Sequence, residues 1–118
     1  MQPPRSKTEA LEAVPVPLPG VHAATTASGL IHISYPAALK PWLARLLPAT
    51  LSPPRRTLEL DVMGSRVWGL IDGQATVRDI ARQLADRSSC HPTETEQAVA
   101  LFVRQLGHRG ILGLREQR

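Results

Sequence analysis

Cysteine and aromatic residues are scarce in this chain of 118 residues, which contains one Cys, two Trp, one Tyr and one Phe. A single cysteine excludes an intramolecular disulfide framework. No uninterrupted apolar run approaches the roughly 20 residues of a membrane-spanning helix, and the N-terminus lacks the apolar segment of a secretory signal. We therefore expect a cytoplasmic protein that does not bind or span a membrane.

The sequence also lacks the motifs that carry enzymatic or metal chemistry. It has no phosphate-cradling glycine loop, no CxxC and no HExxH. His22 and His32 are predicted on neighbouring strands, but two histidines without a third ligand make a poor metal site. Cys90 and His91 are adjacent in a polar loop with no third group to orient them. We expect neither catalysis nor a bound metal or cofactor.

Prolines are crowded into the first half of the chain, where ten of the eleven precede Arg55. Residues 1–20 mix proline with charge, which predicts a disordered tail whose VPVPLP run favours polyproline II geometry. Residues 21–118 are predicted to fold as one domain with an insertion at 36–56. Within the insertion, the run WLARLL predicts a short helix that either caps the core, which is the preferred interpretation, or exposes an apolar patch to a partner. Its apolar side would consist of Trp42, Leu43, Leu46 and Leu47.

Three strands are predicted ahead of the helices. Ser28-Gly29 is typical of a turn and separates two β-leaning runs within Val21 to Tyr35, which indicates a hairpin. Leu58 and Leu60 alternate with Glu59, as in a half-buried strand.

Three helices are predicted after the third strand. Asp61 is expected to cap the first, and Asp72-Gly73 to end it. Thr76 and Asp79 have the spacing of a capping box, which predicts a second helix up to a polar loop that starts at Ala85. Thr93 and Glu96 repeat this spacing and predict a long third helix to about Arg109, stopped by Gly110. The predicted buried positions of the helices are Met63, Val67, Trp68, Leu70, Ile71, Val77, Ile80, Ala81, Leu84, Val99, Phe102, Val103 and Leu106.

One ordered string of residues carries a family resemblance: Leu60-Asp61, Gly64, Val67-Trp68, Leu70, Asp72-Gly73, Thr76 and Ile80. In this string the chain resembles the PqqD family, named for the pyrroloquinoline-quinone biosynthesis protein D and also called RiPP recognition elements. The resemblance covers Val21 to Tyr35 and Thr57 to Leu114. It implies an α+β, winged-helix-like fold in which a three-stranded antiparallel sheet is followed by three helices. It also implies a non-catalytic peptide-binding chaperone, which captures the leader of a ribosomally made precursor peptide by strand addition and presents it to a modifying enzyme, often a radical-SAM enzyme.

The resemblance also implies where the peptide would lie, because the family holds it between the third strand and the third helix. On this chain the strand positions are Arg56, Thr57, Leu58, Glu59 and Leu60, and the helix positions are Ala98, Leu101, Phe102 and Gln105. Arg55, Arg56 and Arg104 are candidates for pairing with acidic residues of a leader peptide. For Leu60 and Phe102, plain core packing is an equally good interpretation.

A winged-helix DNA-binding or regulatory protein is the alternative, since a sheet and three helices fit it as well. The formal net charge is only +4, and the third helix begins TETEQ, whose carboxylates would repel phosphate. The arginines are scattered, each with an acid nearby in the sequence, rather than gathered into a stripe. Nucleic acid is therefore the less favoured partner.

Overall fold

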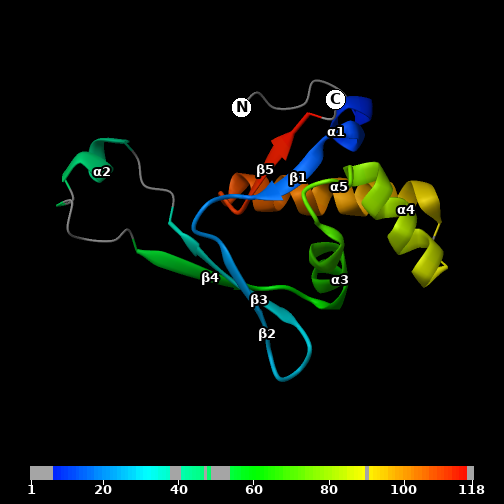
Figure 1. Cartoon of the computed structure of the whole chain (residues 1–118), viewed down its shortest axis with the longest axis horizontal. Coiled ribbons are helices and arrows are strands. Elements are labelled where there is room, and N and C mark those ends of the chain that lie inside the picture. Colours follow the sequence, from blue (N-terminus) through cyan, green and yellow to red (C-terminus); the bar gives the residue numbers. More distant parts are fainter. Residues whose placement is uncertain (1–6, 38–40, 47, 49–53, 90, 117–118) are drawn as a thin grey trace.

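The structure is a computed structural model that describes residues 7–37, 41–46, 48, 54–89 and 91–116 (Figure 1). The elements in chain order are α1 (Lys7–Glu12), β1 (Val14–Pro17), β2 (His22–Thr25), β3 (Ile31–Pro36), α2 (Pro41–Leu46), β4 (Arg55–Glu59), α3 (Val62–Leu70), α4 (Val77–Ser88), α5 (Pro92–His108) and β5 (Leu112–Arg115). Strands β2, β3 and β4 form an antiparallel sheet in that order, and α3, α4 and α5 follow it in the chain. The predicted α+β class is confirmed, while the likeness to a winged helix stays a prediction.

The β2–β3 hairpin turns at the predicted position. Gly29 has a φ of 85°, and the amide of Thr26 donates to the carbonyl oxygen of Leu30 at 2.8 Å. Along β3, Ile33 and Tyr35 are buried, whereas His32 lies on the exposed face. This alternation gives the sheet one apolar face.

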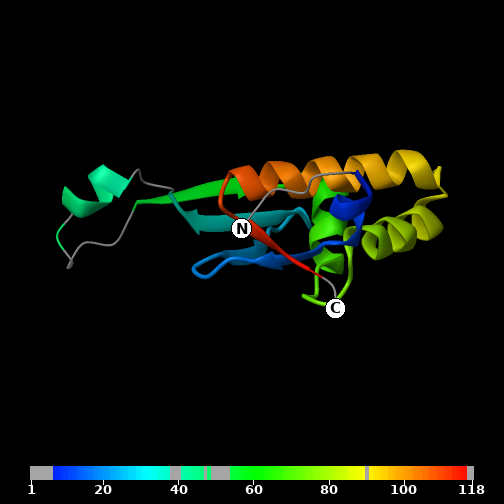
Figure 2. The same cartoon turned by 90° about the horizontal axis from the view of Figure 1, so that it is seen from above.

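The helices and the sheet enclose one hydrophobic core. Its buried members come from α1, from β3, from all three helices that follow the sheet, from the residue after β4 and from the C-terminal segment: Leu11, Ile33, Tyr35, Leu60, Val67, Val77, Ile80, Ala81, Leu84, Val99, Val103, Leu106, Ile111 and Leu112. Figure 2 shows β4 on the same side of the molecule as α5, with β2 on the opposite side. The sheet therefore presents β4, rather than β2, to the longest helix.

The first twenty residues differ from the expected disordered tail, because residues 7–20 form α1, β1 and a turn. Strand β1 pairs with β5 in a second, two-stranded sheet. The amide of Leu18 donates to Ile111 at 2.9 Å, and the register shows that Val14 and Val16 also direct their amides to β5. Pro15 and Pro17 occupy the alternate positions, where the missing N–H costs no ladder hydrogen bond. The proline-rich composition therefore fits an edge strand as well as a tail.

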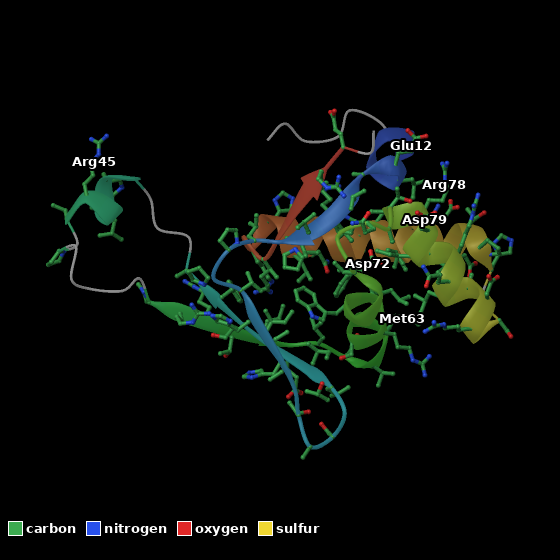
Figure 3. All side chains as sticks on the ribbon, viewed as in Figure 1. Glu12, Arg45, Met63, Asp72, Arg78 and Asp79 are labelled. Carbon is green, nitrogen blue, oxygen red and sulfur yellow. The ribbon has the colours of Figure 1, made fainter. Side chains whose placement is uncertain are left out.

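The insertion also differs from its preferred interpretation. A short helix, α2, does form within WLARLL, but Trp42 is 62% exposed and Leu46 is 71% exposed. Figures 1 and 2 show α2 beyond the ends of β3 and β4, away from the other helices. In Figure 3 the Arg45 side chain is correspondingly set apart from the side chains labelled on α3 and α4. Helix α2 does not cap the core, so its apolar side chains stay available to a partner. Leu47 lies outside the described residues.

Two helix starts agree with the sequence-based expectation. The Asp61 side chain accepts a hydrogen bond from the amide of Gly64 at 2.6 Å, and Thr76 with Asp79 forms a complete capping box. The boundaries that follow them differ. Helix α3 ends at Leu70, before Asp72-Gly73, and α4 continues to Ser88 because Ala85 is buried against the core.

Helix α5 starts two residues earlier than expected, and the predicted Thr93–Glu96 capping box is wrong. His91 is the N-cap, and its Nδ1 accepts the amide of Thr93 at 3.2 Å. Pro92 then occupies the first helical position, which suits proline because the amide there lacks an intrahelical partner anyway. The far end agrees with expectation, since Gly110 has a φ of 80°. Cys90 lies outside the described residues.

Candidate functional site

Strand β4 is an outer strand of its sheet, and within the described ranges no other strand pairs with its outward edge. The amide of Leu60 donates to Ile31 at 2.8 Å, and the amide of Ala37 donates to Pro54, also at 2.8 Å. Both pairs lie in the β3–β4 register, in which hydrogen-bonded pairs alternate with pairs that are not hydrogen-bonded.

This alternation determines which backbone groups of β4 are free. Arg56 and Leu58 direct their N–H and C=O groups to β3, because they fall in step with Leu60 and Pro54. Arg55, Thr57 and Glu59 occupy the alternate positions and direct theirs outward. The open edge therefore offers the backbone donors and acceptors of these three residues to an added strand.

The side chains of β4 divide between the two faces of the sheet. Arg56 and Leu58 stand opposite Tyr35 and Ile33 and share their helix-covered face, while Thr57 and Glu59 lie on the other. Leu58 is half-buried against the core. Leu60 is only 5% exposed, so its side chain belongs to the core and its amide is already bonded to β3.

Helix α5, which lies on the same side of the molecule as β4 in Figure 2, has an exposed face. Ala98, Leu101 and Gln105 are all exposed and recur at spacings of three and four, as neighbours on one helical face do. Leu101 is 54% exposed, so most of its apolar side chain is open to contact. The structure thus keeps the predicted helix positions accessible.

Phe102 lies at the junction of β4, α3 and α5. A Cβ placed on Gly64 would come within 2.9 Å of Phe102 Cε2 and 3.4 Å of Leu60 Cβ. The ring is half-buried and packs against the core. Phe102 therefore contributes to packing through one side, and the glycine of α3 is what allows this close approach.

The arginines named from the sequence have different roles. Arg55 Nε donates to Ser34 Oγ at 2.9 Å, and its Nη2 donates to the carbonyl oxygen of Gly20 at 2.7 Å. The Arg55 side chain thus links β3 to Gly20, which precedes β2, through hydrogen bonds, and these bonds already use two of its N–H donors. The side chains of Arg56 and Arg104 are exposed and form no hydrogen bond or ion pair with any described residue.

A further cation near the site was not identified from the sequence. Arg109, the C-cap of α5, donates from Nη1 to the hydroxyl oxygen of Tyr35 at 3.5 Å. Tyr35 is buried, and Arg56 stands opposite it in register. No direct signal in the sequence indicates this contact, which follows from the burial of Tyr35, because a buried tyrosine hydroxyl group needs a polar partner. At one end of the candidate site, Tyr35 therefore has Arg56 opposite it on β4 and Arg109, the C-cap of α5, at its hydroxyl group.

One carboxyl group has a shifted pKa, and it lies outside this site. The pKa of Asp72 is lowered because the amides of Ala75 and Gln74 donate hydrogen bonds to its side chain. These bonds are 2.8 and 2.9 Å long and form the turn between α3 and α4 (Figure 3). Asp72 has a local structural role there, as its position after a helix indicates.

Neither a membrane-spanning helix nor a metal-binding cluster occurs among the described residues. No helix in that part of the chain is long and apolar enough to cross a membrane. No group of three or more His, Cys, Asp or Glu side chains among those residues is arranged to hold a metal ion.

Comparison with known families identifies the chain. The profile of the family described as coenzyme PQQ synthesis protein D (PqqD) matches residues 49–112, which is more than half of the chain and includes β4, α3, α4 and α5. Searches of the curated proteins and of the solved structures gave no match. The family assignment, the three-stranded sheet and the order of the helices agree with one another. The chain belongs to the PqqD family.

Proposed function

We propose that this protein is a non-catalytic accessory protein that captures the leader segment of a ribosomally made precursor peptide. The leader adds as a strand to the open edge of β4, and the protein presents it to a modifying enzyme, of the radical-SAM type. The observations that support the proposal are the unpaired outward edge of β4 and the exposed Leu101 on α5, the helix that lies on the same side of the molecule as β4 in Figure 2.

The backbone would supply the sequence-tolerant part of the affinity. A peptide in register with Arg55, Thr57 and Glu59 can pair with each of their outward N–H and C=O groups. Each such hydrogen bond contributes about 0.5–1.5 kcal/mol net. A few bonds of this size suit a peptide that has to be released after modification.

The side chains would supply the selectivity. A peptide side chain that points toward the helices meets half-buried Leu58 and exposed Leu101, which favour an apolar residue. Near Tyr35, Arg56 and Arg109 favour an acidic residue, with salt-sensitive steering. Thr57, Glu59, Ala98, Phe102, Gln105 and Arg104 complete the proposed contact surface.

The benefit to the reaction is concentration rather than chemistry. Holding the leader beside the enzyme makes delivery of the rest of the peptide effectively intramolecular. The proposal assigns no catalytic step to this chain, and the chemical change takes place on the partner enzyme.

The test is an amide chemical-shift titration with a candidate precursor peptide, chosen from the small open reading frames that neighbour the gene of this protein. We expect shifts on Thr57, Glu59 and the Ala98–Gln105 face. Thr57→Pro removes one outward donor and should weaken binding about fivefold, or about 1 kcal/mol. Leu58→Pro is unsuitable as a test, because the amide of Leu58 faces β3.

Ala23→Pro is the matched control. Ala23 lies on β2, the opposite outer strand. The amide of Thr26 donates to Leu30, so in the alternating register Ala24 and His22 also direct their amides to β3, and the amide of Ala23 faces outward. It should leave the affinity unchanged. Equal weakening by both prolines, or tight binding of duplex DNA without a response to the peptide, would refute the proposal.

A further inference from the structure

A second surface lies between α3 and α4, away from the β4 edge. It is a cleft of about 430 Å³ lined by Ser65, Arg66, Gly69 and Leu70 of α3 and by Leu84 and Arg87 of α4. This volume falls within the range of about 300–1,000 Å³ that is typical of ligand sites. In Figures 1 and 2, α3 lies between β4 and α4, so the cleft and the strand edge can be occupied at the same time.

The base of the cleft is apolar, and its accessible part is Gly69 with half-buried Leu70. Leu84 is buried and Leu70 is half-buried, so both present hydrocarbon rather than polar groups. Gly69 is exposed, and a Cβ built on it would meet nothing within 4 Å. A ligand side chain can therefore approach the backbone of α3 closely at this point.

The charge of the cleft is positive and uncompensated. Arg66 and Arg87 are exposed and form no hydrogen bond or ion pair with any residue that the structure describes. None of the helical neighbours three or four positions from Arg66 is acidic, and the same holds for Arg87 toward the start of α4. By contrast, Arg82 has acids at both spacings, Asp79 and Asp86. Nearness to an acid in the sequence therefore does not neutralise the two arginines of the cleft.

We propose that this cleft binds an acidic segment of a protein partner, in which carboxylates flank an apolar side chain. The carboxylates pair with Arg66 and Arg87, and the apolar side chain packs on Leu70 and Leu84. Nucleic acid fits less well, because no aromatic side chain lines the cleft to stack on a base, and two cations hold few phosphates. The inference does not depend on the function proposed for β4.

The experiment titrates the full chain with a short blocked peptide in which glutamates flank a leucine. We expect amide shifts on Arg66, Gly69, Leu70 and Arg87, and binding that weakens as salt is added. The counterpart peptide with glutamine in place of glutamate should bind about tenfold more weakly. The double variant Arg66→Gln/Arg87→Gln should lose a similar factor, whereas Arg82→Gln should change nothing.

Several outcomes would overturn the inference. Equal binding of the glutamine peptide, or equal loss in Arg82→Gln, would show attraction that is not specific to the cleft. Shifts on Thr57 and Glu59 alone would assign the peptide to the β4 edge. Displacement of the peptide by inorganic phosphate at similar concentration would identify a small-anion site, and stronger shifts with duplex DNA would identify a nucleic-acid surface.

Discussion

The contact between Gly64 and Phe102 allows a sharp test of how α3 packs on α5. Gly64→Ala would place its Cβ at 2.9 Å from Phe102 Cε2 and 3.1 Å from the capping oxygen of Asp61. Overpacking of this kind costs about 1–3 kcal/mol. Alanine in place of glycine in a helix gains up to about 1 kcal/mol, so the expected net change is a loss of about 0–3 kcal/mol.

Gly69→Ala is the matched control on the same helix. A Cβ at Gly69 meets nothing within 4 Å, so only the favourable helix term applies, and the variant should gain up to about 1 kcal/mol. The predicted difference between the two alanine variants is therefore about 1–3 kcal/mol. It applies to substitutions with the same chemistry, which makes it more reliable than either absolute value.

Urea-induced unfolding followed by circular dichroism measures both free energies of unfolding. A second readout follows from the place of Phe102, because a displaced ring should also alter the amide shifts of Leu60 and of the Ala98–Gln105 face. The reasoning is refuted if Gly64→Ala is as stable as Gly69→Ala. Phe102→Leu introduced together with Gly64→Ala should recover part of the loss, since it removes the atom that clashes.

Further predictions concern the two tryptophans and Asp72. Trp68 packs against the core but is only half-buried, so Trp68→Ala should lower the free energy of unfolding by about 2–3 kcal/mol. Trp42 lies on exposed α2, so Trp42→Ala should change it by no more than about 0.5 kcal/mol. Equal losses of stability in urea unfolding would contradict the isolated position of α2. The pKa of Asp72 is lower in the folded chain than its ordinary 3.8, so its contribution to stability is present above that value and is lost as the pH falls below it. An NMR pH titration of the carboxyl carbon should give a pKa below 3.8, and Asp72→Asn should reduce the acid sensitivity of unfolding in that range; an ordinary pKa would refute the turn geometry.

Local signals in the sequence predicted the starts of α3 and α4, because capping depends on residues that are three positions apart. Asp61 and Thr76 cap α3 and α4 as expected. The start of α5 was misplaced because two local patterns compete there, and His91-Pro92 prevails over Thr93 with Glu96. The position of Trp42 could not be predicted, since a short amphipathic helix has the same sequence pattern whether its apolar side finds a core or not.

The candidate site could be assigned to β4 and α5 from the family resemblance. Which backbone N–H and C=O groups of β4 face outward depends on its register with β3, which is distant in the sequence. The alternation of Leu58 and Leu60 revealed which side chains point inward and left open which amides face outward. That choice follows from the pairing of Ile31 with Leu60, which residues near β4 do not specify. Arg55 was taken for a ligand contact for the same reason, because its bonds to Ser34 and Gly20 join segments that are distant in the chain.

The outer strands differ in the backbone N–H groups that their register directs outward. On β1 the outward positions are Pro15 and Pro17, which have no N–H to offer, so that edge is a poor template for another strand. On β4 the outward positions are Arg55, Thr57 and Glu59, all of which keep their donors. Strand β2 keeps its donors as well, but it lies on the side of the sheet opposite α5 (Figure 2). Among these three strands, only β4 combines a complete set of outward donors with a position on the same side of the molecule as α5 and its exposed Leu101, which is why we place peptide capture there.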